Sequence, residues 1–210
     1  MRSLGPIPMS KRIVDILLST LILVITLPFT LSVLVLIFAT NILRGHPHYP
    51  LFYSEQRYSH GKPFFLYKFN IFKYEQILEA KANGVFIETK YFEKNGGVTW
   101  IGWILKQIYM DELPQLYNVP RGAMTASATR PVNKQVFEKL MAEGVDHKRK
   151  VRAGITGNFQ SYKQIAGKDA NTLDQEYVEY YLHKPWYTLL WFDTKIILRT
   201  LKVIIKARGV

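Results

Sequence analysis

The longest apolar segment of the chain lies near its N-terminal end. Ile16 to Thr40 comprises 25 consecutive uncharged residues, most of them Leu, Ile, Val, Phe or Thr. This run exceeds the roughly 20 residues that a helix needs to cross the hydrocarbon core of a bilayer. It is too long for a cleaved signal peptide, and no small-residue cleavage site follows it. The pattern therefore predicts a membrane helix.

Pro28 interrupts this segment near its middle. A proline inside a helix removes a backbone hydrogen bond and kinks the chain, and each arm of about 12 residues, roughly 18 Å, reaches about halfway through a bilayer. Basic residues flank both ends, Lys11 and Arg12 before the segment and Arg44 and Arg57 after it. Because cytoplasmic flanks are enriched in Lys and Arg, this favours a re-entrant helix-break-helix over a single crossing, which stays the alternative.

Asp15 follows Lys11 and Arg12 by four and three residues. Opposite charges at these spacings pair on one helix face. We interpret Asp15 as an interfacial ion-pair partner rather than as a catalytic residue.

The rest of the chain shows shorter patterns without repeats or long linkers. These patterns predict a domain of the α+β class that is mainly helical. We therefore divide the chain into a membrane segment, residues 11–43, and a membrane-associated cytosolic domain, residues 44–210. Leu51 to Ser54 and Pro63 to Phe72 are typical of strands around the turn residues Ser59-His60-Gly61 and predict a β-hairpin. Val85 to Phe92 is a further candidate strand, and Asn95-Gly96-Gly97 is a candidate loop.

Helical patterns occupy three internal stretches and one at the C-terminal end. Tyr74 to Ala82 ends at the stop signal Asn83-Gly84, and Asn133 to Glu143 has a capping asparagine and a terminal Gly144. Trp100 to Met110 suits a core helix or a membrane-surface helix equally.

In the C-terminal stretch, basic residues recur at spacings of four, three and four between apolar ones, and two tryptophans precede them. This predicts a basic amphipathic helix in the membrane interface, although a surface helix packed on the core would look similar. The basic residues are Lys195, Arg199, Lys202 and Lys206, and the tryptophans are Trp186 and Trp191. The run His147 to Lys150 is interpreted as a solvated face.

Composition narrows the choice of partners. The formal charge is +12, from 28 basic and 16 acidic residues, which favours phospholipid headgroups, nucleotide phosphates or nucleic acid. The chain has no cysteine, so disulfides and thiolate metal sites are excluded. The 13 Tyr, 12 Phe and 4 Trp suit a protein at the membrane interface. The five histidines show no convincing metal-ligand spacing.

Residues 111–119, Asp-Glu-Leu-Pro-Gln-Leu-Tyr-Asn-Val, are the most informative stretch. Asp111 is expected to cap a helix, and Pro114 is tolerated in its first turn. A helix N-terminus carries partial positive charge and free N–H groups, which suit carboxylates and phosphate. Adjacent carboxylates do not face each other on a helix and are usually only a solvated cap.

The whole string resembles the signature of the bacterial sugar transferases, the small monotopic polyprenol-phosphate phosphoglycosyl transferases. That signature continues with Gly-Asp-Met-Ser and Gly-Pro-Arg-Pro. Further matches are the blocks around Gln56-Arg57 and Tyr67-Lys68-Phe69, the stretch Gly154-Ile155-Thr156-Gly157, and Asp193 near the end. The resemblance covers residues 11 to 209 in order.

The resemblance implies that Asp111 attacks a UDP-sugar, forms a covalent phosphosugar and passes it to polyprenol (undecaprenyl) phosphate, initiating an exopolysaccharide, O-antigen or similar glycan. It also implies Mg²⁺ held by Glu112 and Asp111, with Glu112 as a second catalytic residue. The expected location is the cytoplasmic face of the bacterial inner membrane, with contact to anionic lipid and possible homodimers. Substrate or phosphate contacts are expected from Lys106, Arg130, Lys68 and Arg57, and additional roles are possible for Asp193, Gln115 and Asn118.

Several positions depart from the family pattern. Ala123 replaces an aspartate, Ala128-Thr129 replaces Gly-Pro, Asn70 replaces a basic residue, and Leu27 rather than serine precedes Pro28. These changes leave a non-catalytic member that binds lipid or an assembly partner as the alternative function. A nucleic-acid-binding membrane protein rests on charge alone, and we expect no nucleic-acid partner.

Overall fold

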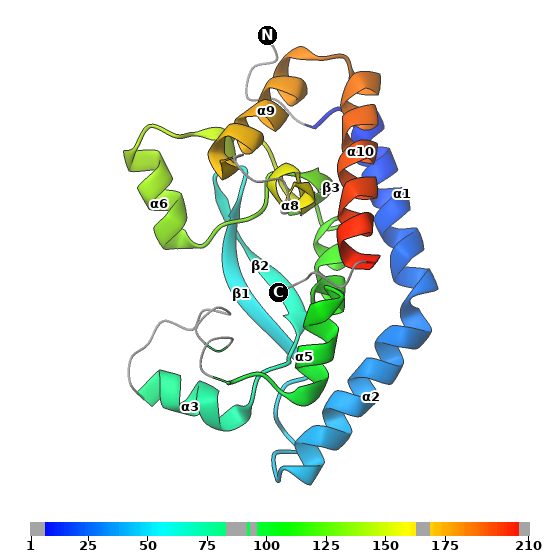
Figure 1. Cartoon of the computed structure of the whole chain (residues 1–210), viewed down its shortest axis with the longest axis vertical. Helices are drawn as coiled ribbons and strands as arrows, with labels where there is room; N and C mark the ends of the chain where they lie inside the picture. The colour runs from blue at the N-terminus through cyan, green and yellow to red at the C-terminus, as the bar shows by residue number, and fades with distance from the viewer. Residues whose placement is uncertain (1–6, 83–91, 93–95, 163–168, 206–210) are drawn as a thin grey trace.

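Figure 1 shows a computed structural model of the chain, which describes residues 7–82, 92, 96–162 and 169–205. Helices predominate, and two small sheets lie among them. The helices are α1 Met9–Ile25, α2 Leu27–Leu43, α3 Tyr74–Ala82, α5 Trp100–Gln107, the 3-10 helix η1 Met110–Asn118, α6 Lys134–Ala142, α7 His147–Lys150, α8 Asn158–Ser161, α9 Ala170–His183 and α10 Trp186–Ile205. The strands are β1 Phe52–Ser59, β2 Lys62–Phe69, β3 Met124–Ala128 and β4 Ala153–Gly157.

The apolar N-terminal segment forms two helices, α1 and α2, bent by 57° at Thr26. Pro28 lies in the first turn of α2, where the missing N–H costs no helical hydrogen bond. The Thr26 hydroxyl donates to the Ile22 carbonyl at 2.7 Å and closes the last turn of α1. Among the described helices, none alone has the length and apolar character to cross a membrane, whereas α1 and α2 meet that test as a bent pair.

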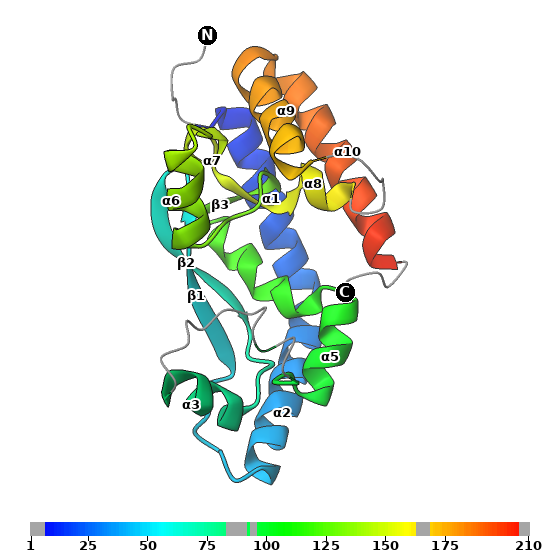
Figure 2. The same ribbon diagram turned by 60° about the vertical axis from the view of Figure 1, so that its left-hand side comes forward.

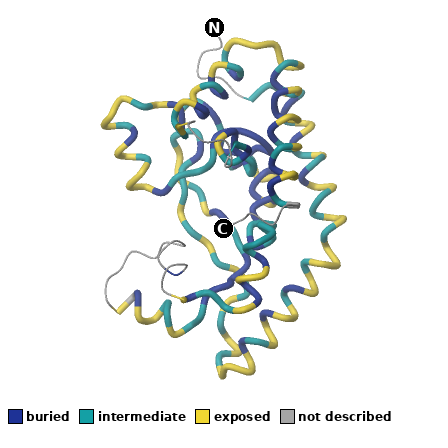
Figure 3. The backbone as a smooth tube through the Cα atoms, viewed as in Figure 1, coloured by how far each residue is buried: buried dark blue, intermediate teal, exposed yellow. Residues whose placement is uncertain are grey.

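Both helices carry large apolar side chains that are exposed on the surface. In Figure 3, exposed positions recur along α1 and α2 at the right-hand edge of the molecule. Leu17, Leu21, Val24 and Ile25 on α1 are between 56% and 67% exposed. Leu31 and Val35 on α2 are 54% and 65% exposed.

The predicted hairpin is confirmed, with longer first and shorter second strands than the pattern indicated. β1 pairs with β2 antiparallel from Phe52↔Phe69 to Ser59↔Lys62. Both central turn residues, His60 and Gly61, have positive φ angles of 51° and 73°, as a two-residue type I′ turn requires. The separate sheet β3–β4 is parallel. Of the candidate strand Val85 to Phe92, only Phe92 is described, and it is helical.

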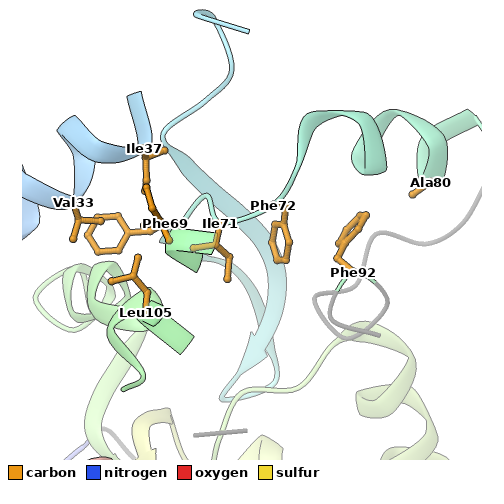
Figure 4. Packing of buried hydrophobic residues seen from close by; sticks show 9 residues of the cluster. Val33, Ile37, Phe69, Ile71, Phe72, Ala80, Phe92 and Leu105 are labelled. Atoms are coloured by element: carbon orange, nitrogen blue, oxygen red, sulfur yellow. The ribbon is translucent and has the colours of Figure 1, made fainter. Parts of the chain in front are cut away.

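One core joins α2 to the hairpin and α5. Figure 4 shows Val33 and Ile37 of α2 beside Phe69, with Leu105 of α5 on the opposite side. A second core lies between α9 and α10, where Tyr177, Leu189 and Ile196 are completely buried. Figure 2 shows α9 and α10 side by side at the end of the molecule where α1 begins.

The other helix predictions are confirmed with small changes in their ends. The Asn133 side chain caps α6 by accepting from the Val136 N–H at 2.8 Å. α3 ends at Ala82, and its expected stop lies outside the described residues. α5 packs on the core through the buried Ile101 and Leu105, as the core-helix prediction requires, whereas Trp100 and Trp103 are exposed.

The interpretation of His147 to Lys150 as a solvated face was wrong for its first half. His147 and Lys148 are 2% and 7% exposed. Lys148 is buried because its Nζ atom contacts Asp174 Oδ2 of α9 at 2.5 Å. This partner lies too far along the chain to be read from the local pattern.

Candidate active site

The two motif carboxylates lie at the start of η1, which is a 3-10 helix rather than the expected α-helix. The helix begins at Met110, and its N-cap is Tyr109, whose φ of 55° is left-handed, so the prediction of Asp111 as the N-cap was wrong. In a 3-10 helix, side chains three residues apart line up. Glu112, Gln115 and Asn118 therefore share one row, and Asp111 projects from the adjacent row.

Asp111 is 4% exposed. Burial and the neighbouring charge of Glu112 raise the pKa of its carboxyl from 3.8 to about 6, although Lys68 and Lys106 act in the opposite direction. The candidate nucleophile is thus a buried carboxylate whose charge is incompletely compensated. Such a group gains by forming a bond to an electrophilic phosphorus.

Glu112 has a different electrostatic environment. Its two carboxylate oxygens accept from Arg130 Nη2 at 2.9 and 2.7 Å, and Lys68 Nζ lies 3.4 Å from Oε1. Burial alone would raise the pKa of Glu112, but Arg130 and Lys68 outweigh it and lower the pKa to about 2. The adjacent carboxyls therefore have pKa values on opposite sides of their ordinary range.

A chain of charges extends from Glu112 onto the hairpin. Lys68 of β2 lies 3.7 Å from Glu55 Oε1 on β1, and Glu55 Oε2 lies 2.9 Å from Arg57 Nη2. Lys68 is opposite Tyr53 in the ladder, which places it diagonal to Glu55. The structure thus brings together four of the predicted site residues, Glu112, Arg130, Lys68 and Arg57, through Glu55.

Sequence reasoning missed Glu55. The signal was available in principle, because Glu55 and Arg57 lie on the same face of one strand. A carboxylate beside two predicted phosphate-binding cations is expected to hold those cations in position.

Arg130 reaches Glu112 from the loop that follows β3. Its Nη1 also donates to the Ile155 carbonyl of β4. A Cβ atom on Gly157 would lie 2.7 Å from Arg130 Cγ, so a residue with a side chain there would displace the arginine. This gives a physical reason for a glycine at the end of the matched Gly-Ile-Thr-Gly stretch.

The backbone of Arg130 is held from the other side. Lys148 Nζ donates to the Arg130 carbonyl at 2.9 Å while it pairs with Asp174. Lys148 and Asp174 are both 7% exposed at their side chains, so the pair is almost completely withdrawn from solvent.

Replacing Lys148 by methionine is expected to destabilise the protein by about 3 to 5 kcal/mol, because it removes the cation that compensates the buried charge of Asp174. His147 Nε2, 3.6 Å from Asp174 Oδ2, replaces it poorly, since burial lowers the pKa of His147. Chemical denaturation of the purified variant measures this loss. The double variant Lys148→Met/Asp174→Leu removes both charges and is expected to recover most of the stability. A single variant as stable as the wild type would contradict this assignment.

Two other predicted residues, Gln115 and Asn118, are buried on η1. Gln115 is completely inaccessible, and within the described part of the chain neither end of its amide has a hydrogen-bond partner. The same holds for Asn118 Nδ2. Buried amides without partners carry an energetic penalty.

Asp193 belongs to another group of contacts. Its Oδ2 accepts from Lys11 Nζ at 2.6 Å, and its Oδ1 from the Tyr177 hydroxyl at 2.9 Å. Lys11 also lies 3.4 Å from Asp15, as the predicted ion pair requires, but this pair is buried rather than interfacial. These contacts tie α1 to α9 and α10, which is an architectural role for Asp193.

Two apolar pockets flank η1. One, of about 190 Å³, is bordered by α1, η1 and α10, and Glu112 lies in its wall. The other, of about 330 Å³, lies beside the α1–α2 bend and the hairpin. Leu113 contributes to both. The carboxylate site is therefore next to space suited to apolar chains.

The residues present are compatible with Mg²⁺. Among the described residues no group of three acidic or histidine side chains gathers. Magnesium, however, commonly takes only one or two carboxylates together with phosphate oxygens of the substrate. Asp111 and Glu112 supply such a pair.

A buried carboxylate beside an ionised one, with arginine and lysine around them and apolar pockets alongside, is suited to phosphoryl transfer involving an apolar substrate. A sequence model of the bacterial sugar transferase family matches residues 7–207. The chain belongs to this family, which confirms the resemblance and the prediction of a transferase at family level.

Curated proteins give the same assignment. The chain is 29% identical to the undecaprenyl-phosphate galactose phosphotransferase of Salmonella typhimurium, over 95% of this chain and 41% of that protein. It is 31% identical to the UDP-glucose:undecaprenyl-phosphate glucose-1-phosphate transferase of Escherichia coli, over 90% of this chain and 39% of that protein. An uncharacterised sugar transferase of Bacillus subtilis is 28% identical, over 95% of this chain and 89% of that protein. The chain thus spans less than half the length of the first two relatives.

Proposed function

We propose that the protein transfers a phosphosugar from a UDP-sugar to polyprenol phosphate at the cytoplasmic face of the bacterial inner membrane. The observation that supports this most strongly is the buried Asp111 carboxylate next to Glu112, which Arg130 and Lys68 hold ionised. Family membership supports the same reaction class.

Asp111 is the proposed nucleophile. One of its carboxylate oxygens attacks the phosphorus that carries the sugar, a bond from Asp111 to phosphorus forms, and the bond to the bridging oxygen of UMP breaks. UMP leaves with that electron pair. An oxygen of polyprenol phosphate then attacks the same phosphorus, and the bond to Asp111 breaks and regenerates the carboxylate.

The surrounding charges have distinct proposed tasks. The charges of Lys106 and Lys68 both lower the pKa of Asp111, so they would also favour a phosphate bound at Asp111. With its pKa of about 2, Glu112 stays ionised at neutral pH, which suits metal binding rather than proton transfer. Magnesium bound by Glu112 and Asp111 would neutralise charge on the diphosphate and on departing UMP.

The lipid acceptor is proposed to place its chain in the apolar pocket whose wall includes Glu112. Ile22 of α1 and Ile197 of α10 line this pocket. A polyprenol chain there would have its phosphate at the carboxylates, as the second step requires.

Membrane attachment is proposed to be re-entrant and monotopic, through α1 and α2. The 57° bend and the exposed apolar sides of both helices support this arrangement. α10 adds an interfacial surface, since Trp186 and Trp191 are 49% and 60% exposed and Lys195 lies over the Trp191 ring.

The test is UMP release by detergent-purified protein with magnesium and undecaprenyl phosphate, across a panel of UDP-sugars. Release that requires one particular sugar would support the transferase and identify its donor. A folded protein that releases no UMP from any sugar would instead favour the non-catalytic alternative.

The rate of UMP release is expected to depend on pH through Asp111. Attack requires the ionised carboxylate, and the Asp111 pKa is about 6. The single-turnover rate should therefore rise about tenfold per pH unit below pH 6 and level off above it. A rate that stays constant between pH 4.5 and 8 would contradict the role of this group.

A further inference from the structure

A second group of basic residues lies around Gly122, in the loop after η1. Arg12 of α1, Arg152 before β4, and His60 and Lys62 at the hairpin turn form this group, which we call the Gly122 basic cluster. Figures 1 and 2 show the start of α1 and the hairpin turn toward the same end of the molecule. None of the four residues belongs to the proposed catalytic site.

The two arginines converge on one open point. A Cβ atom on Gly122 would lie 3.7 Å from Arg12 Nη2 and 3.9 Å from Arg152 Nη1, with no other heavy atom closer. Gly122 has a φ of 85°, a conformation that other residues rarely adopt. The space between the guanidinium groups therefore remains free of a side chain from this position.

The Arg12 guanidinium is fixed in place. It donates to the carbonyls of Val119 at 2.7 Å, Pro120 at 3.1 Å and Met124 at 3.4 Å. Since a guanidinium has five N–H groups, donors remain for an external acceptor. The loop wraps around a cation that is already oriented.

These charges have little internal compensation. Asp15 is the acid near Arg12, but its oxygens contact Lys11 and Thr125. In the described ranges, the side chains of Arg152 and Lys62 take part in no ion pair or hydrogen bond. Burial, together with the charges of Arg152 and Lys62, lowers the pKa of His60. Like charges that converge without a carboxylate between them favour an external anion.

The cluster is separate from the candidate active site. Asp111 lies near the start of η1, whereas the Gly122 loop follows its end. At a rise of about 2 Å per residue, the chain advances roughly 16 Å from Asp111 to Val119. A diphosphate bound at Asp111 would not extend that far, so a different anion is required.

We propose that the Gly122 basic cluster binds the phosphate of an anionic phospholipid headgroup. The choice of a lipid rests on the proposed function, in which α1 enters the membrane at Arg12 and so places this cluster at headgroup level. Guanidinium groups bind phosphate oxygens through paired, charge-assisted hydrogen bonds. Free phosphate offers the same oxygens, and the experiment distinguishes the two sources.

The test is a thermal-unfolding titration of the detergent-purified full chain with dihexanoyl phosphatidylglycerol below its micelle concentration. Saturable stabilisation is expected, and the zwitterionic dihexanoyl phosphatidylcholine should have no effect. Arg152→Gln is expected to weaken the apparent affinity about tenfold, since it removes one charge-assisted contact. Lys134→Gln is the matched control, because Lys134 lies on α6 and is 60% exposed. The apparent lipid affinity of this variant should equal that of the wild type.

Ala123→Asp is a second variant, which keeps all four basic residues. It places a carboxylate in the loop that surrounds Arg12 and should also weaken lipid binding. Wild-type affinity in Arg152→Gln would overturn the proposal. Equal stabilisation by inorganic phosphate, with no gain from the lipid, would overturn the lipid assignment. The titration contains no sugar donor, so its outcome is independent of whether the protein releases UMP.

Discussion

Replacing Asp111 by asparagine is expected to lower the rate of UMP release by at least about a thousandfold. Asparagine has nearly the same volume but lacks the anionic oxygen that attacks phosphorus, so the covalent route is lost. The measurement is single-turnover UMP release with the preferred UDP-sugar. Activity within tenfold of the wild type would remove Asp111 from the mechanism.

The same substitution should stabilise the fold, which separates loss of chemistry from loss of structure. The pKa of Asp111 rises from 3.8 to about 6 on folding, a difference worth about 3 kcal/mol as an upper estimate. The folded state binds this proton more tightly, so the destabilisation is absent below pH 3.8 and complete above about pH 6. Asp111→Asn should therefore unfold at a higher temperature than the wild type at pH 8, and the difference should vanish near pH 3.5.

Replacing Arg130 by glutamine is expected to lower the rate by about tenfold to a hundredfold, the range for loss of a group that holds a metal ligand in position. Arg130 contacts both oxygens of Glu112, so its loss also raises the pKa of Glu112 and disturbs the proposed metal ligand. Arg130→Lys keeps the charge but not the paired geometry, and we expect an intermediate rate.

Arg149→Gln is the control for this series, because it makes the same chemical change at an exposed arginine. Its rate should equal that of the wild type. A full rate of UMP release in Arg130→Gln, or an equally large loss of rate in Arg149→Gln, would contradict the proposed role of Arg130.

Local patterns predicted the elements whose determinants lie within a few residues. The hairpin followed from strand residues around His60 and Gly61, and α6 followed from the capping residue Asn133. The kink followed from Pro28, although the chain bends two residues earlier, at Thr26. In each case a single residue type restricts the backbone, so no knowledge of distant contacts was needed.

Features set by distant partners were not predicted. Lys148 is buried because of Asp174 on another helix, and Asp193 pairs with Lys11 from the opposite end of the chain. The 3-10 geometry of η1 likewise disagrees with the α-helical start that its cap and proline indicated. Tertiary packing decides these features, and sequence spacing carries no signal for them.

The sequence indicated which residues belong to the candidate site, but not how their side chains contact one another. The resemblance supplied Asp111, Glu112, Arg130, Lys68 and Arg57. It assigned Arg130 to substrate phosphate, whereas the structure shows its guanidinium on Glu112. Only side-chain positions show that this cation contacts a carboxylate and lowers its pKa.

Trapping the phosphosugar on the protein tests most directly whether Asp111 is the nucleophile. The purified chain would be incubated with magnesium and the preferred UDP-sugar in the absence of polyprenol phosphate, then digested and analysed by mass spectrometry. The peptide containing Asp111 is expected to gain the mass of one phosphosugar, and added polyprenol phosphate should remove it. The Asp111→Asn variant should never carry this modification. UMP release and lipid-linked product without any modified peptide, or a phosphosugar on another residue, would contradict Asp111 as the nucleophile.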